Sequence, residues 1–398
     1  MTDFTTTGGV RPQFDGEARH MRPLVLKGLL LTLLTLGVYR FWYQTDVRRF
    51  LWSRTAIEGD GLEYTGRGLE LFLGFLIALA VLIPAYVIIA LLSFAGGPIL
   101  QVAAQFAFSL AIVFLAQYAL YRARRYRLSR TLWRGVRLGQ TGSGWAYAGR
   151  CFGWGLLTVL TLGLAYPFMR ASLERYKMNN TWYGDQQGRF TATGGQLFRQ
   201  GVPLWFLVAV LIAVPAALLA SAAANAPDAG RELGRAGWLG MLFLFAAVPV
   251  ILAVMAIYQA LEFRWWANGV HVGPASARCD LGLFAFLKTY LGYVLALLLF
   301  SIATAVVFAV VGAALGGTAA LREGGAPALV FTAIAYLATL LGYAALGQLY
   351  VVRPLWKKSF ESVTLTGLGA LVAAQSTEPP ANAFGEGVAD ALDFGAGF

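Results

Sequence analysis

The stretch LLTLLTLGVYRFWYQTDVRRFLWSRT, Leu30 to Thr55, decides how this chain relates to a membrane. It begins like a membrane-spanning helix, is interrupted at Thr35-Leu36-Gly37, and ends in aromatic residues and arginines. Such a segment either crosses a bilayer or enters it and returns to the same side. The answer determines on which side most of the positive charge of the chain lies.

The composition is that of a membrane protein. Of the 398 residues, 58% are hydrophobic and 13% are charged, whereas soluble domains carry about 25% charged residues. Uncharged runs of the length needed to cross a hydrocarbon core of roughly 30 Å recur along the chain. The sequence therefore predicts six transmembrane helices, in Leu71–Leu120 (two spans), Val202–Ala224, Gly237–Leu261, Thr289–Gly316 and Ala328–Val352. The first 22 residues contain no apolar region typical of a signal peptide.

The distribution of Lys and Arg favours a returning path for Leu30–Thr55. If this segment and a similar one at Leu156–Phe168 both crossed, 15 of the 31 basic residues would lie outside. If both return, only Arg231, Arg235 and Arg322 lie outside. Cytoplasmic loops are enriched in Lys and Arg. We therefore expect re-entrant or interfacial segments, although Pro23–Tyr43 is long enough for an ordinary span.

An internal repeat with an offset of 126 residues supports a shared design for the two segments. LLTLLTLGVYRFW (Leu30–Trp42) returns as LLTVLTLGLAYPF (Leu156–Phe168), and the same shift pairs Arg49 with Arg175 and Thr55 with Thr181. We call the two copies the LTLG segments. The repeat predicts two units that run in the same direction through the membrane.

A shorter motif follows several helix ends. Its copies are RRFLWSRTAIEG (Arg48–Gly59), RRYRLSRTLWRG (Arg124–Gly135), ERYKMNNTWYG (Glu174–Gly184) and EFRWWANGVHVG (Glu262–Gly273), with a degraded fifth copy in Arg353–Gly367. In the first three copies a threonine follows an arginine by six residues. Alternating residues around Gly59-Asp60-Gly61 then predict a hairpin. The expected fold class is thus all-α, with short β-hairpins at the cytoplasmic face.

These patterns predict five successive regions. They are a cytoplasmic N-terminal segment (1–22), a first membrane repeat (23–150), a second membrane repeat (151–283), a C-terminal helix pair (284–352) and a cytoplasmic tail (353–398). Residues Ser376–Phe398 carry four acidic residues and no basic one. This acidic tail is expected to extend as a strand or arm, or to fold back on the basic motifs.

The chain resembles the YjgN-like family of bacterial inner-membrane proteins, a domain of unknown function. The residues that carry the resemblance are LTLGVYRFWYQTDVRRFLWSRTAIEGDGLEYTGRGLELF, the second LTLG…RYKMNNTWYG unit and the terminal GEGVADALDFGAGF. The resemblance implies a multi-pass location in the inner membrane. It supplies no catalytic or binding residue.

Several function classes are disfavoured. The net charge of +11 lies at the ends of apolar spans, which topology explains without a nucleic-acid partner. Two cysteines and two histidines offer no zinc spacing or disulfide framework. Nucleophile–base pairs, paired carboxylates and a P-loop lysine are missing from the sequence. We expect neither an enzyme nor a cofactor or metal.

The motif arginines are open to two interpretations. They anchor helix ends to anionic headgroups, worth about 1 kcal/mol each, or they form a site for a phosphorylated lipid or acidic solute, because arginine binds phosphate through two N–H groups. The candidates are Arg48, Arg49, Arg122, Arg124, Arg125, Arg130, Arg175 and Arg264, and the densest cluster runs from Arg122 to Arg137. Asp46, Glu174 and Glu262 are expected to form local ion pairs with the motif arginines.

Two functional hypotheses remain open. Glycine-interrupted apolar segments at matching positions of two repeats are typical of a transporter binding site. The candidate path is lined by Thr32, Thr35, Gly37, Thr158, Thr161 and Gly163, unless these residues only allow close helix packing. The six spans hold no deep ionisable residue, which favours a passive or lipid-related route. The alternative is a non-catalytic membrane-organising protein whose basic cytoplasmic face binds anionic lipid headgroups or a soluble partner, with a homo-oligomer possible. Both termini are expected in the cytoplasm.

Overall fold

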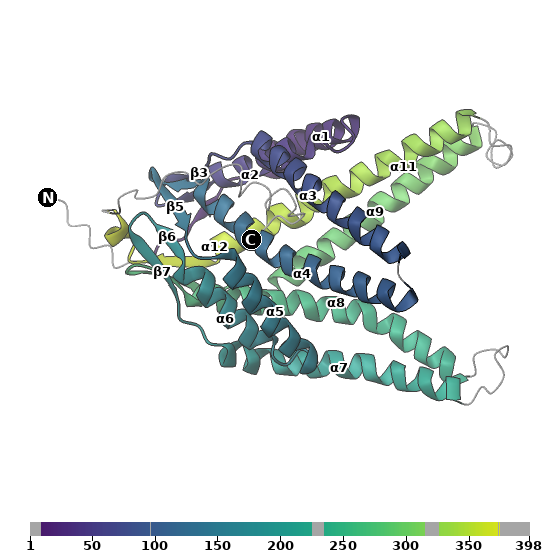
Figure 1. Ribbon diagram of the computed structural model, residues 1–398. Coiled ribbons are helices and arrows are strands. Elements are labelled where there is room, and N and C mark those ends of the chain that lie inside the picture. Colours follow the sequence, from purple (N-terminus) through teal and green to yellow (C-terminus); the bar gives the residue numbers. More distant parts are fainter. Residues whose placement is uncertain (1–8, 96, 225–234, 315–325, 373, 375–398) are drawn as a thin grey trace.

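Within the residues that the structure describes, ten of the helices form five hairpins, and pairs of strands follow these hairpins along the chain (Figure 1). The computed structural model describes residues 9–95, 97–224, 235–314, 326–372 and 374. The acidic tail and the loop residues Arg231 and Arg322 lie outside the described residues. The helical hairpins are α1–α2 (Ala18–Leu34, Arg40–Ser53), α3–α4 (Gly68–Ala95, Pro98–Ser129), α5–α6 (Gly144–Leu160, Tyr166–Asn179), α7–α8 (Gly194–Ala224, Arg235–Gly269) and α9–α11 (Ala285–Ala314, Ala326–Gly347).

The strands occupy the turns between these helical hairpins. They are β1 (Gln13–Phe14), β2 (Thr55–Ile57), β3 (Asp60–Tyr64), β4 (Thr131–Trp133), β5 (Val136–Gln140), β6 (Thr181–Tyr183), β7 (Gln186–Phe190), β8 (Val270–Val272), β9 (Ala275–Cys279) and β10 (Val363–Thr366). After α11, a π-helical turn η1 (Gln348–Val352) and α12 (Arg353–Glu361) lead to β10, and a 3₁₀ turn η2 (Leu368–Leu371) follows it.

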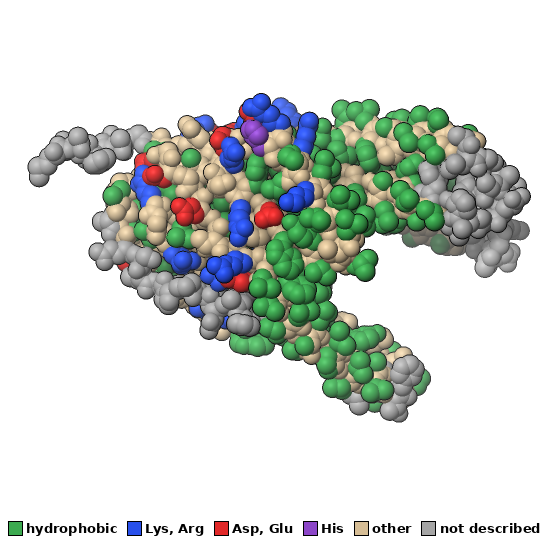
Figure 2. All heavy atoms as spheres, turned by 90° about the horizontal axis from the view of Figure 1, so that it is seen from above, with side chains coloured by type: hydrophobic (Ala, Val, Ile, Leu, Met, Phe, Trp, Pro, Cys, Tyr) green, Lys and Arg blue, Asp and Glu red, His purple; other side chains and the backbone are tan. Residues whose placement is uncertain are grey.

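In the part of the chain that the structure describes, six helices are long and apolar enough to cross a membrane, which confirms the predicted number. The candidate spans are Gly68–Leu91, Pro98–Ser129, Gly194–Ala224, Gly237–Gly269, Ala285–Ala313 and Thr332–Glu361. In the most apolar stretch of each span, at most 22% of the residues are buried within the protein. Hydrophobic side chains cover the extended arms, whereas charged side chains gather at the sheet end (Figure 2). The molecule therefore has one polar end and one apolar end.

The strands form one sheet, which corrects the prediction of separate small hairpins in an all-α fold. All ten strands pair antiparallel in the order of the sequence, from β1 to β10. Tight turns at Glu58-Gly59 and Arg134-Gly135, with positive φ at both positions, close two of the hairpins. The helical hairpins place successive strand pairs side by side, so their free edges meet and pair, as β3 does with β4.

The N-terminal segment links the two edges of this sheet. Gln13 and Phe14 pair with β2, while Val10 exchanges two backbone hydrogen bonds with Leu365 of β10, at 2.8 and 2.7 Å. Successive side chains of a strand point to opposite faces. One face forms a common apolar cluster that includes Trp133, Tyr183 and Leu365, and the residues after β10, Leu368, Leu371 and Ala374, pack into it. The residues that follow β10 thus cover the apolar cluster on this face of the sheet.

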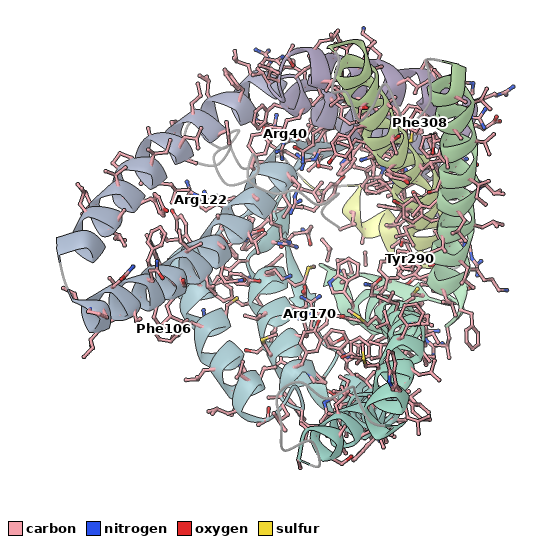
Figure 3. The ribbon with its side chains drawn as sticks, turned by 90° about the vertical axis from the view of Figure 1, so that its right-hand side faces the viewer. Arg40, Phe106, Arg122, Arg170, Tyr290 and Phe308 are labelled. Atoms are coloured by element: carbon pink, nitrogen blue, oxygen red, sulfur yellow. The ribbon has the colours of Figure 1, made fainter. Side chains whose placement is uncertain are left out.

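The helices form a ring above the sheet. Each helix contacts its neighbours in chain order, from α1 against α2 to α9 against α11, and α11 returns to contact α1. Figure 3 looks along this ring from the ends of the long helices. Arg40, Arg122 and Arg170, labelled there, come from three neighbouring hairpins. The two LTLG hairpins, α1–α2 and α5–α6, are markedly shorter than the other three.

Candidate functional site

The LTLG segments form tight turns between two helices. In the first, Gly37 N–H donates to the Thr32 carbonyl at 2.7 Å, and Leu36 and Gly37 have φ of 51° and 94°. In the second, Gly163 N–H donates to the Thr158 carbonyl at 2.7 Å, with φ of 50° and 91° at Leu162 and Gly163. This backbone pattern is a Schellman helix end, so each segment returns to the sheet end of the molecule.

The threonine hydroxyls of the candidate path take part in these turns. Thr35 and Thr161 donate to carbonyls one helical turn earlier and accept from the backbone N–H of Tyr39 and Ala165. Thr32 and Thr158 donate to Gly28 and Trp154 carbonyls. These contacts agree with a structural role for the six residues. Their role in a substrate path stays a prediction.

The motif threonine joins one helical hairpin to the next. Thr55, fully buried, donates to the Leu51 carbonyl and accepts from Trp356 Nε1 at 2.9 Å. Thr131 accepts from Trp52 Nε1 at 3.1 Å. Thr181 accepts from Arg124 at 2.9 Å. In each case the donor belongs to the preceding unit of the ring, so the hydroxyl fixes the contact between units.

Neighbouring residues of the motif face different environments. A basic residue that is exposed or half-buried lies six residues before each of five strands. These residues are Arg49 before β2, Arg125 before β4, Arg175 before β6, Arg264 before β8 and Lys357 before β10. We call these five residues the outer cations. A helix rises about 1.5 Å per residue, so they lie about 9 Å along their helices from the sheet. The residues just before them include the buried Arg48, Glu174 and Trp356.

Most of the other candidate arginines are engaged inside the protein. Arg48 donates to the Tyr64 hydroxyl at 3.3 Å, Arg124 to Gln140 at 2.6 Å and Arg130 to Glu70 at 3.0 Å. The dense cluster also contains Arg134, which pairs with Glu58 and Asp60 across the sheet and stacks over Trp133. Arg122 likewise makes interactions within the protein. This cluster therefore connects helices and strands.

The acidic residues only partly follow their expected pairing. Asp46 lies 3.8 Å from Arg49, as expected. Glu174, however, pairs with Arg170 and Lys177, and Glu262 of α8 pairs with Arg170 of α6. Burial alone would raise the pKa of Glu174, but Lys177 and Arg170 outweigh it and hold this pKa below its ordinary value. Sequence spacing missed the pair between α6 and α8 because its partners are 92 residues apart.

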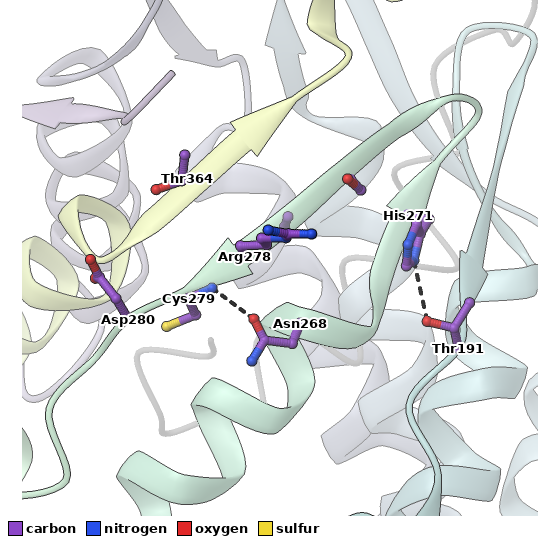
Figure 4. Close-up of a pocket in the computed structure, with 9 residues that line it drawn as sticks. Thr191, Asn268, His271, Arg278, Cys279, Asp280 and Thr364 are labelled. Atoms are coloured by element: carbon purple, nitrogen blue, oxygen red, sulfur yellow. Dashed lines mark hydrogen bonds between the residues drawn. The ribbon is translucent and has the colours of Figure 1, made fainter. Parts of the chain in front are cut away.

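A groove crosses the outer face of the sheet at β8 and β9 (Figure 4). It has a volume of about 590 Å³ and is lined by Thr191, Asn268, His271, Ser276, Ala277, Arg278, Cys279, Asp280 and Thr364. Asn268 Oδ1 accepts from the Cys279 backbone N–H at 2.8 Å. A second hollow of about 280 Å³, which shares Thr191, contains Arg175 and Arg189. Only Arg175 among these residues is a candidate predicted from the sequence. Asn268 and His271 lie within the fourth motif copy, Glu262–Gly273, but the motif does not indicate that they line a groove.

Groups of three or more metal-ligating side chains are not found within the described ranges. A comparison with known protein families identifies the family of this chain. Its residues 10–391 match the bacterial proteins of unknown function called DUF898. The chain belongs to this family. The match is consistent with the YjgN-like resemblance of its motifs and covers both the helical ring and the sheet. Neither a curated protein nor a solved structure matches this chain.

Proposed function

We propose that this DUF898 protein is a non-catalytic, multi-pass protein of the inner membrane that binds anionic lipid headgroups through its outer cations. The supporting observation is their common level: Arg49, Arg125, Arg175, Arg264 and Lys357 all stand six residues before a strand. On α4 and α8 the uncharged segments begin only beyond Arg122 and Glu262. The outer cations therefore belong to the polar zone beside the hydrocarbon core, where phosphates of the lipids lie.

The orientation follows from charge. The sheet end carries nearly all Lys and Arg, and cytoplasmic surfaces of membrane proteins are enriched in these residues. With the sheet in the cytoplasm, six helices cross and both termini are cytoplasmic. The LTLG hairpins then enter the cytoplasmic leaflet only, with Leu36 (95% exposed) and Leu162 (79% exposed) at their tips. Apolar tips of this exposure gain by contact with acyl chains.

A matched pair of double variants tests headgroup binding. Arg49→Gln/Arg264→Gln removes two outer cations, and Arg19→Gln/Arg67→Gln removes two exposed arginines that are not outer cations. Each basic residue near an anionic surface contributes about 1 kcal/mol, so the first variant should lose much of the enrichment of phosphatidylglycerol around the protein in mixed nanodiscs. The second variant should keep it. Equal enrichment around the wild type and the first variant would contradict the proposal.

A passive, lipid-related route is the second candidate, and the spacing of the long hairpins favours it. Outside their own pair, α3 and α4 contact α2 and α5 of the short hairpins and make no comparable contact with α7, α8, α9 or α11 in the described part of the chain. The long arms are splayed apart in Figure 1. Above each short hairpin, a bilayer would therefore fill the space between two long arms.

The predicted path residues lie in the two short hairpins that border these spaces. They are Thr32, Thr35 and Gly37 in the first hairpin and Thr158, Thr161 and Gly163 in the second. A route for lipids along them predicts that the purified protein speeds the exchange of fluorescent phosphatidylglycerol between leaflets of proteoliposomes. Dithionite quenching would show the exchange as loss of the protected inner-leaflet signal. Vesicles whose protected signal is the same with and without protein would exclude the route, while headgroup binding is judged by the nanodisc experiment alone.

A further inference from the structure

Exposed cations lie in a row across the outer face of β7, β8 and β9. Arg189 of β7 is opposite His271 of β8, which is opposite Ser276 of β9. Arg278 follows two residues after Ser276 and lies on the same face, because alternate residues of a strand share a face. Arg189 and Arg278 are exposed and His271 is half-buried. The groove of Figure 4 and the hollow beside it follow this row.

The positive charge of this row is not compensated within the described part of the chain. Arg175, Arg189 and Arg278 have no ion-pair partner among the described residues. The one carboxylate that lines the groove, Asp280, lies 2.5 Å from Arg11 and is neutralised by it. Like charges placed close together on a sheet are destabilising. An anion in the groove would remove that repulsion.

Neutral hydrogen-bond donors accompany the cations. Asn268 uses its side-chain oxygen to accept from Cys279 N–H, so its amide nitrogen remains a donor. Neutral His271 adds no donor to this set, because its Nδ1 lies 3.1 Å from the Gly269 carbonyl, which can only accept, and its single N–H is used there. Thr191 lines both hollows and joins them. Guanidinium groups, an amide and a hydroxyl form a set of donors suited to an oxyanion.

We propose that the groove along β7–β9 binds a phosphate group. Arginine matches phosphate with two parallel N–H bonds, and a monoester phosphate carries a charge of about −1.5 to −2 at neutral pH, which suits three uncompensated guanidinium groups. The volume leaves room for the organic part of a small phosphorylated molecule. The site shares only Arg175 with the outer cations, whereas Arg189 and Arg278 lie on the sheet itself. It therefore stands whether or not the outer cations bind lipid.

Calorimetric titration of the full chain in an uncharged detergent tests the site. Inorganic phosphate and dihexanoyl phosphatidylglycerol are the two probes. Arg189→Gln/Arg278→Gln should weaken binding at least tenfold, whereas the matched variant Arg19→Gln/Arg67→Gln, which removes two exposed arginines outside the groove and outside the outer cations, should leave it unchanged. Both pairs are exposed or half-buried, and Arg189→Lys/Arg278→Lys, which retains the charge, should bind more weakly than the wild type but more tightly than the glutamine variant.

The two probes distinguish the source of the phosphate. Binding of inorganic phosphate with this residue dependence indicates a soluble ligand. Binding of phosphatidylglycerol alone, with the same dependence, indicates a lipid headgroup that reaches the sheet. Failure of both probes to bind the wild type, or an equal loss in the two matched glutamine variants, would overturn the proposal. The nanodisc experiment depends on Arg49 and Arg264 and the titration on Arg189 and Arg278, so the two proposals fail separately.

Discussion

Arg48 and Arg49 are neighbours in the chain, yet one is buried and the other is exposed. The sequence predicts the importance of the pair and the six-residue spacing to Thr55. It does not predict which arginine turns inward, because that depends on the neighbouring unit of the ring. Arg124, which corresponds to Arg48 in the next long hairpin, donates a hydrogen bond to Thr181, 57 positions further along the chain. Contacts of this kind have no local signature.

Thr55→Val tests the joining role of the motif threonine. The change leaves Trp356 Nε1 without its acceptor in a buried position, which costs about 1–3 kcal/mol. We expect a lower midpoint of unfolding in mild detergent, whereas Thr364→Val on the outer face of the sheet should have little effect. In a Trp356→Phe background the same change should cost less. An equal cost in both backgrounds would assign the effect to something other than this hydrogen bond.

Glu174 gives the stability a dependence on pH. Its pKa is held below the ordinary value in the folded protein, so the unfolded chain binds a proton more readily. The stabilisation is therefore complete above the ordinary pKa of a glutamic acid and is lost as the pH falls through the lower folded-state pKa. The difference in melting temperature between wild type and Glu174→Gln should be large at pH 7 and shrink on acidification. A difference that is constant with pH would contradict this account.

At the scale of elements, the LTLG turns were the most predictable feature. The Thr-Leu-Gly interruption marks the position of each turn, and Gly37 and Gly163 adopt a left-handed conformation that glycine tolerates. The strands were only half predictable. Turn residues such as Gly59 indicate the hairpins, but pairing between hairpins depends on helices that carry each strand pair to its neighbour. The sequence therefore predicts separate hairpins and does not reveal that they join into one sheet.

Gly37→Ala measures the backbone requirement of the turn. A Cβ at Gly37 meets no atom within 4 Å, so only its φ of 94° resists the change, at about 1–2 kcal/mol. Gly149 of α5 is equally open but has no left-handed conformation, and Gly149→Ala should be neutral or stabilise the helix. We expect opposite shifts of the melting temperature. Shifts of the same sign and size would show that the turn imposes no left-handed conformation.

For the whole molecule, the ring of helices over a single sheet explains the charge asymmetry of the chain. The sheet gathers every strand at one end, so each helical hairpin must leave and return on that side. Hydropathy and charge predicted six spans and two returning segments, and the structure contains six suitable helices. The joining of the sheet edges by Val10 and Leu365 could not be predicted, because it connects residues 355 positions apart through backbone bonds alone.

The most direct test of the account is labelling of single cysteines in intact cells. Cys151 and Cys279 are replaced by alanine, and a cysteine is placed at Ser53, at Ser143, or at Gly97 in the turn between α3 and α4. With the sheet in the cytoplasm, Gly97→Cys should react with an impermeant maleimide, and Ser53→Cys and Ser143→Cys should react only after permeabilisation. Reaction of Ser53→Cys or Ser143→Cys in intact cells would contradict the returning hairpins and the single-sided sheet.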